Sequence, residues 1–191
     1  YLKGATFLAR GKQMAGAMGR VDEKDLDAAF RRPPLSSEQV LHPEKYWDEE
    51  QRDDPVAVRL PDLGGDWEDV LAVTLGEVNL TVLAAGEKAS QVDLSNPMSL
   101  MGKHTHPGAE GWGGDRLRAW KNSATDEWAL VLATVWDTSE DAKEFADAWE
   151  VPDTDAPHAA AREGRTLVAC WGAEAVGRLD EMLNAATPAR D

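Results

Sequence analysis

Residues 115–137 read DRLRAWKNSATDEWALVLATVWD and have the pattern of a β-hairpin. Polar and apolar side chains alternate over residues 116–121, as they do in a strand with one face on a core. The run WALVLATVW at 128–136 is almost entirely apolar, which is typical of a buried strand. Between these segments NSATD supplies turn-forming residues, so the sequence predicts two antiparallel strands here.

The chain after this hairpin predicts a helix, one more strand and a last helix. Thr138 or Ser139 is the expected N-cap of a helix that ends near Trp149. A connection rich in Pro, Asp, Ala and Gly follows at 152–164, then a strand at 165–171 and a helix at 173–186. The expected order of this half is therefore β-β-α-β-α.

The chain before the hairpin predicts mainly helices. These cover residues 2–19, run from a cap at Asp22 to near Phe30, and follow the capping sequence SSEQ at 36–39. Asp66 is the expected cap of a long helix over 67–85, which is apolar around most of its circumference and therefore central. A short strand is expected at 55–60.

Helices and strands are thus segregated along the chain, which predicts the α+β class. We expect N-terminal helices and a long central helix, followed by a small antiparallel sheet. The expected segments are a mainly helical one at 1–88, a loop at 89–114 and the β-β-α-β-α segment at 115–191, joined in one compact unit.

Composition excludes several classes of function. The 191 residues hold 35 Asp and Glu against 20 Lys and Arg, a net charge of −15. Such a surface repels phosphate backbones and anionic lipids, so nucleic acids and membrane surfaces are not expected partners. No apolar run approaches the ~20 residues of a transmembrane helix. The composition is that of a soluble globular protein rich in Trp, and it leaves the compartment open.

Three groups of residues are candidates for a metal, ligand or structural site. His104 and His106 have a spacing that can chelate a metal, but a site needs a third ligand, and a solvated loop is the alternative. Trp112, Asp115 and Arg116 lie in GWGGDR, a candidate ligand loop without a phosphate-binding pattern. A tight entry into a strand, with Trp112 buried, is the alternative for this segment. The lone Cys170 follows apolar residues, has no partner for an internal disulfide, and is expected to be buried and inert.

Three further residues are candidates for catalysis. His42 and Tyr46 lie in SSEQVLHPEKY at 36–46 and have side chains that donate hydrogen bonds at reaction centres. A structured turn is the alternative role of that segment. Glu77 is the one acid within the apolar helix, so it needs a partner. We expect either an Arg across the core or a role in supporting a catalytic group.

Several segments together resemble one family. They are YLKGATF at 1–7, PPLSSEQVLHPEKY at 33–46, TLGE at 74–77, GWGGDR at 111–116, WDT at 136–138 and DAKEF at 141–145. In this order they resemble the C-terminal part of poorly characterised bacterial proteins similar to gluzincin-type zinc metallopeptidases. The segment at 36–46 is the most specific. In that family an HExxH helix and a later Glu helix lie upstream of the matching part.

The chain contains no HExxH, and His104 and His106 are too close for that zinc pair. The family's zinc ligands therefore have no positions here, and no complete catalytic constellation is present. Zinc is expected only with an upstream half, or weakly at His104 and His106. Because HExxH is absent, we expect either that an upstream half has been removed or that the chain is a stand-alone relative without the catalytic half.

The resemblance implies a non-catalytic C-terminal part that supports or covers a catalytic half. The dense polar segment at 36–46 adds the hypothesis that this part lends His42 or Tyr46 to the cleft. Its partner is then that half, and oligomers are expected to form through the first helix. One alternative is a stand-alone acidic module that binds a protein or peptide. Another is a metal-binding loop at His104 and His106.

Overall fold

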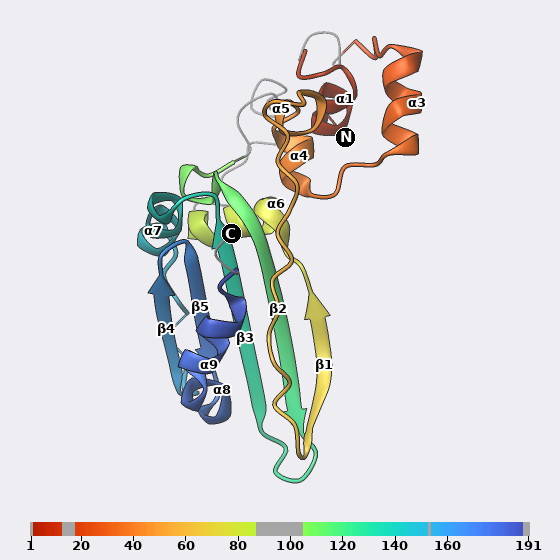
Figure 1. Cartoon of the computed structure of the whole chain (residues 1–191). Coiled ribbons are helices and arrows are strands. Elements are labelled where there is room, and N and C mark those ends of the chain that lie inside the picture. Colours follow the sequence, from red (N-terminus) through yellow and green to blue (C-terminus); the bar gives the residue numbers. More distant parts are fainter. Residues whose placement is uncertain (1, 13–17, 87–104, 153, 189–191) are drawn as a thin grey trace. The chain divides into compact units, whose positions relative to one another are not determined.

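The computed structural model describes residues 2–12, 18–86, 105–152 and 154–188. They divide into two compact units. The helical unit comprises Tyr1–Pro55 and Gly76–His106, and the sheet unit comprises Val56–Leu75 and Pro107–Asp191. Helices and an antiparallel sheet coexist, which confirms the predicted α+β class (Figure 1). Within the described ranges no helix is both long and apolar enough to cross a membrane.

The sheet unit is built on five antiparallel strands in the order β1-β2-β3-β5-β4. The strands are β1 (Trp67–Val73), β2 (Trp112–Asn122), β3 (Trp128–Trp136), β4 (His158–Glu163) and β5 (Thr166–Trp171). The predicted hairpin is confirmed, since β2 and β3 pair along their length as far as Lys121 opposite Trp128. The Asn122 side chain accepts hydrogen bonds from the backbone N–H groups of Ala124 and Thr125, which closes the turn.

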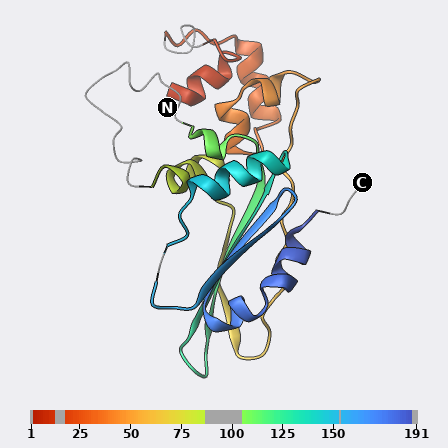
Figure 2. The same ribbon diagram turned by 90° about the vertical axis from the view of Figure 1, so that its left-hand side faces the viewer.

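Alternate side chains of β3 enter two different packed layers. Those at odd positions, such as Val131 and Val135, are buried together with Met182 of helix α9 (Leu179–Ala186). Helices α8 (Ala173–Gly177) and α9 lie along the sheet at the blue end of the chain (Figures 1 and 2).

The even position Trp136 belongs to the other layer. Its ring contacts Phe145 of helix α7 (Ser139–Ala148), with the centroids 4.8 Å apart. The predicted N-cap of α7 is confirmed, because Thr138 and Asp141 form a capping box. Trp136 is fully buried, as are Trp112 and Trp120, so core packing accounts for these three indoles.

The predicted long central helix is wrong over its first half. Residues 67–73 form β1, and only Gly76–Ala85 are helical, as α6. Residues 67–73 pair with β2, and Asp115 of β2 accepts a hydrogen bond from the N–H of Leu75. The apolar run that suggested one helix therefore spans two elements of different type.

Three smaller expectations also differ from the structure. The connection at 152–164 contains β4, whose Ala-rich sequence lacks the β-branched residues that mark strands. The order after the hairpin is therefore α-β-β-α-α, because the predicted last helix is also divided at Arg178. Residues 55–60 are not a strand, although the N–H of Val56 donates to the carbonyl of Gly113.

The helical unit contains short helices around an aromatic cluster. They are α1 (Leu2–Leu8), α3 (Glu23–Arg31), α4 (Ser37–Leu41) and α5 (Glu44–Trp47), and α6 of the same unit packs against α4. The predicted caps at Asp22 and Ser36 are confirmed by side-chain hydrogen bonds to Lys24 N and Gln39 N. Phe7 of α1 lies 4.9 Å from the ring of Tyr46, centroid to centroid.

The first helix is shorter than the predicted 2–19. It ends at Leu8, and Arg10 and Gly11 take positive φ angles of 52° and 77°, which are incompatible with a continuing helix. Residues 13–17 of the predicted helix lie outside the described residues.

Candidate functional site

The segment at 36–46 folds into two short helices with His42 at the corner between them. Ser36 caps α4, His42 is the C-cap of that helix, and Pro43 precedes α5. The Gln39 amide holds the segment in place, since it donates to the carbonyl of Asp53 and to Oδ1 of Asp54. These contacts fix the backbone on the α4 side of the imidazole.

Glu77 reaches His42 from the first turn of α6. Nε2 of His42 lies 2.9 Å from Oε1 of Glu77, whose side chain is fully buried. The other carboxylate oxygen of Glu77, Oε2, is buried and has no hydrogen-bond partner among the described residues. On the opposite side of the ring, Nδ1 lies 3.8 Å from Oε1 of Glu44. Of the two roles expected for Glu77, pairing with an Arg across the core is wrong, because its partner is His42.

Gly76 makes this placement of Glu77 possible. Its φ angle is 74°, a conformation that side chains with a Cβ rarely adopt. A Cβ at this position would also lie 2.6 Å from Oγ of Ser37. Glycine therefore lets α6 begin beside α4, with Glu77 directed at the imidazole.

The chemistry of the pair follows from its partners. A carboxylate only accepts hydrogen bonds, so Nε2 of His42 carries the proton that it shares with Glu77. This hydrogen bond raises the pKa of His42, while burial acts in the opposite direction and the charges of Glu77, Glu44 and Glu38 add to the increase. His42 is half-buried, so Nδ1 is the nitrogen left to accept a proton when the ring is neutral or donate one when it is charged.

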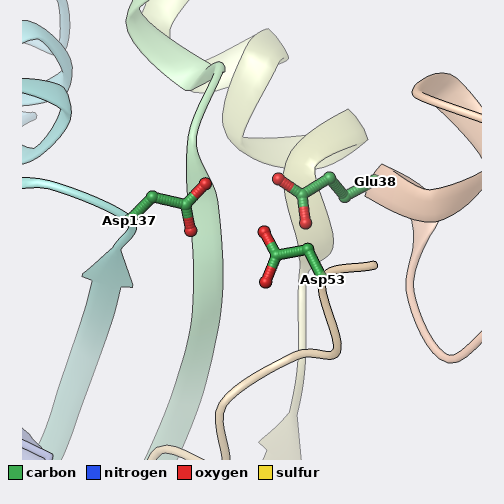
Figure 3. A group of neighbouring side chains, drawn as sticks. All are labelled: Glu38, Asp53 and Asp137. Carbon is green, nitrogen blue, oxygen red and sulfur yellow. The ribbon is translucent and has the colours of Figure 1, made fainter. Parts of the chain in front are cut away.

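A second polar cluster lies in the same unit. Nζ of Lys45 lies 2.7 Å from Oε1 of the buried Glu38 and 2.8 Å from Oδ2 of Asp53. Figure 3 shows the carboxylates of Glu38 and Asp53 facing each other. Asp137, also labelled there, belongs to the sheet unit. The Lys45 ammonium thus joins α5 to α4 and to the loop at 48–54.

A surface hollow of about 440 Å³ is lined in part by the residues that directly follow His42 in the sequence. It is lined by Arg10, Pro43, Glu44, Trp47, Asp48 and Glu49. The Arg10 guanidinium lies 4.7 Å from the centroid of the Trp47 ring and forms an ion pair with Asp25. Three carboxylates and one aromatic face are thus gathered around a space that can hold one side chain.

Tyr46, the second catalytic candidate of the 36–46 segment, has a role in packing. Its ring is buried and its hydroxyl donates to the carbonyl of Arg32. Of the three catalytic candidates, the structure therefore brings His42 and Glu77 together, while Tyr46 packs against Phe7 and Trp47.

The other candidate ligands lie elsewhere. In the sheet unit, Nε1 of the buried Trp112 donates to Asp115, so these two candidates contact each other, while Arg116 is partly exposed. The predicted strand entry at Trp112 is confirmed. His106 belongs to the helical unit, and His104 lies outside the described residues.

Sequence reasoning did not single out Arg118, a cation of the sheet unit with several partners. Its guanidinium forms ion pairs with Asp62 and Asp69 and donates to the carbonyl of Leu60. It lies among alternating residues of β2, and no sequence signal distinguishes it from Arg116. These contacts attach the segment before β1 to the sheet.

Residues 45–182 match the model of a family described as Domain of unknown function (DUF8575). The chain belongs to the DUF8575 family. The matching range includes Glu77 and begins just after His42. No match is found among curated proteins, and none among solved structures. The DUF8575 assignment carries no activity, so the function is argued from the His42–Glu77 pair.

Proposed function

We propose that the chain is the non-catalytic C-terminal part of a metallopeptidase-like protein, and that it supplies His42 to a reaction cleft. The observation that carries this proposal is the 2.9 Å contact between Nε2 of His42 and the fully buried Glu77. A buried carboxylate on one ring nitrogen orients the imidazole and leaves the other nitrogen for chemistry. The catalytic half, with its zinc ligands, is a separate part under this proposal.

The role of His42 in such a cleft is to donate a hydrogen bond or a proton. With the pKa raised by Glu77, the ring is protonated over a wider pH range than a free imidazole. A charged donor stabilises the negative charge that develops on a carbonyl oxygen during peptide hydrolysis. Glu77 is a positioning residue, because it acts through His42.

The metallopeptidase part of the proposal is supported by resemblance. The segments PPLSSEQVLHPEKY at 33–46 and TLGE at 74–77 are among those that carry it, and they contain His42 and Glu77. Two segments about thirty residues apart in the chain thus contribute one side chain each to a single contact. Tyr46 is left out of this role because its hydroxyl donates to the backbone.

The first test is the intact mass of the native polypeptide, compared with the coding sequence upstream of Tyr1. We expect a longer chain that carries HExxH. A native polypeptide without that motif would contradict the metallopeptidase role.

The second test is the peptidase activity of the native polypeptide with His42→Gln. The glutamine amide still donates to Glu77 but cannot be protonated, so we expect kcat to fall by about 10²–10³. The exposed His158 is the matched control, and His158→Gln should retain activity. Equal activity of both variants would remove His42 from the mechanism.

A stand-alone binding role is the second candidate, and the hollow beside Trp47 is the observation that favours it. The hollow has three carboxylates against the single guanidinium of Arg10, which stacks on Trp47, so its net negative charge suits a Lys or Arg side chain of a peptide. We expect a short Lys/Arg peptide to shift the NMR signal of the Trp47 indole in the wild type, and Glu49→Lys to abolish that shift. A Glu-rich peptide that binds equally well would contradict this candidate.

A further inference from the structure

Glu44 connects the His42–Glu77 pair to the hollow beside Trp47. Its Oε1 lies 3.8 Å from Nδ1 of His42, the ring nitrogen that Glu77 does not contact. The same side chain lines the hollow, together with Pro43, which directly follows His42. Because the side chain of Glu44 is half exposed, a group that enters the hollow can reach its carboxylate. One carboxylate is thus shared between the imidazole and the hollow.

The charges of the hollow are not balanced by its own residues. Its lining contains three carboxylates, those of Glu44, Asp48 and Glu49, and one cation, Arg10. Arg10 forms an ion pair with Asp25, which lies outside the lining, so its positive charge is already matched. A cation that enters the hollow therefore meets a lining of net negative charge.

The Trp47 ring makes the hollow suitable for a long basic side chain. Its apolar surface can hold the methylene groups of Lys or Arg, while the carboxylates hold the charged end. The protein itself shows this kind of contact, since the Arg10 guanidinium lies 4.7 Å from the centroid of the ring. The lining thus recognises both parts of a Lys or Arg side chain.

We propose that His42 and the hollow form a single substrate site, in which a Lys or Arg side chain of a peptide occupies the hollow and pairs with Glu44. This proposal rests on the role in peptide hydrolysis proposed above for His42. It adds the class of substrate, a peptide with a basic residue next to the bond that reacts. Glu44 is then a specificity residue as well as a neighbour of the imidazole.

Occupation of the hollow changes the protonation of His42. Carboxylates on three helices raise the pKa of His42, namely Glu77 of α6, Glu44 of α5 and Glu38 of α4. A cation held at Glu44 opposes this effect, so its binding lowers the pKa of His42 toward the ordinary value. By linkage, protonation of His42 weakens the binding of a basic peptide by the same factor. The lowered pKa makes the imidazolium a stronger proton donor once the substrate is in place.

The test is an NMR titration of the chain with two tripeptides, N-acetyl-Gly-Lys-Gly-amide and its uncharged norleucine counterpart. We expect the Lys peptide to shift the indole signal of Trp47 and, at saturation, to lower the titration midpoint of His42 by about 0.5 pH units. The Lys peptide should also bind about threefold more weakly well below that midpoint than well above it. The norleucine peptide should bind at least about tenfold more weakly than the Lys peptide.

Two variants separate pairing with Glu44 from general attraction to the hollow. Glu44→Gln and Glu49→Gln each remove one negative charge from the lining, so both should weaken binding of the Lys peptide. At saturation Glu49→Gln should keep the shift of the His42 midpoint, whereas Glu44→Gln should lose most of it, because the ammonium is no longer held beside the imidazole. Glu50→Gln is the matched control, since Glu50 is exposed, lies next to Glu49 and is outside the lining.

The proposal is overturned if the Lys peptide does not bind at about 10 mM, or if the norleucine peptide binds as tightly. It is equally overturned if the Lys peptide saturates the hollow without moving the His42 midpoint, or if Glu44→Gln keeps the full shift. None of these measurements needs peptidase activity, whereas the proposed function is tested by the activity of His42→Gln. The two proposals can therefore fail separately.

Discussion

At the scale of single residues, the partner of His42 decides which of its ring nitrogens is available. Glu77 is the only carboxylate of the three near this ring that is fully buried and within hydrogen-bond distance of it. The residue is an acid inside an apolar helix, a placement that needs compensation. The imidazolium supplies that compensation, so the pair contributes to stability as well as to the proposed chemistry.

The stability of the chain is expected to depend on the protonation of His42. Its pKa is raised in the folded state above the ordinary value of 6.5. The stabilisation is therefore fully present below about pH 6.5 and is lost as the pH rises through the raised pKa. We expect the free energy of unfolding, measured by urea titration, to decrease as the pH rises above about 6.5.

His42→Gln supplies the comparison for this measurement. It keeps the hydrogen bond to Glu77 but does not titrate, so its free energy of unfolding should fall less over the same interval. NMR titration of the wild type should place the midpoint for His42 above the ordinary imidazole value of 6.5. A midpoint at or below 6.5 would contradict the assigned contact.

Gly76 is the residue that connects this pair to the backbone. We expect Gly76→Ala to lower the free energy of unfolding by about 1–3 kcal/mol, because of its positive φ and the contact with Ser37. Gly64 has a similar φ of 71° with open space around it, so Gly64→Ala measures the backbone effect alone. In a Ser37→Ala background, the loss at Gly76 should fall toward the Gly64 value. An equal loss with and without Ser37 would show that the contact is unimportant.

At the scale of elements, the accuracy of the sequence predictions follows the strength of local signals. The β2–β3 hairpin was predicted because alternation, β-branched residues and a turn agree there. The caps at Asp22, Ser36 and Thr138 were predicted because each is a polar side chain before a helix, and all three accept the expected hydrogen bonds.

Elements defined by distant contacts were not predictable in this way. Residues 67–73 are as apolar as the helix that follows, and pairing with β2 decides that they are a strand. β4 has an Ala-rich sequence without strand propensity, and it forms because it pairs with β5. His42 and Glu77 were both candidates, but their contact was not foreseen, since they lie 35 residues apart.

At the scale of the whole molecule, the protection of the sheet core can be measured at Cys170. The thiol lies among the buried residues of the core, and burial raises its pKa to about 12. We expect its reaction with a thiol reagent at neutral pH to be at least about a thousandfold slower in the native protein than in denaturant. A rate within tenfold of the denatured protein would show that this core opens readily.

During synthesis, the helical unit can be completed only after the first part of the sheet unit has been made. Because the helical unit is interrupted at Pro55 and resumes at Gly76, its first half leaves the ribosome before Glu77 has been made. The nascent chain must therefore produce residues 56–75, which belong to the other unit, before His42 meets its carboxylate. A polypeptide released at Pro55 would contain the whole 36–46 segment and still lack the contact that gives its imidazole a raised pKa.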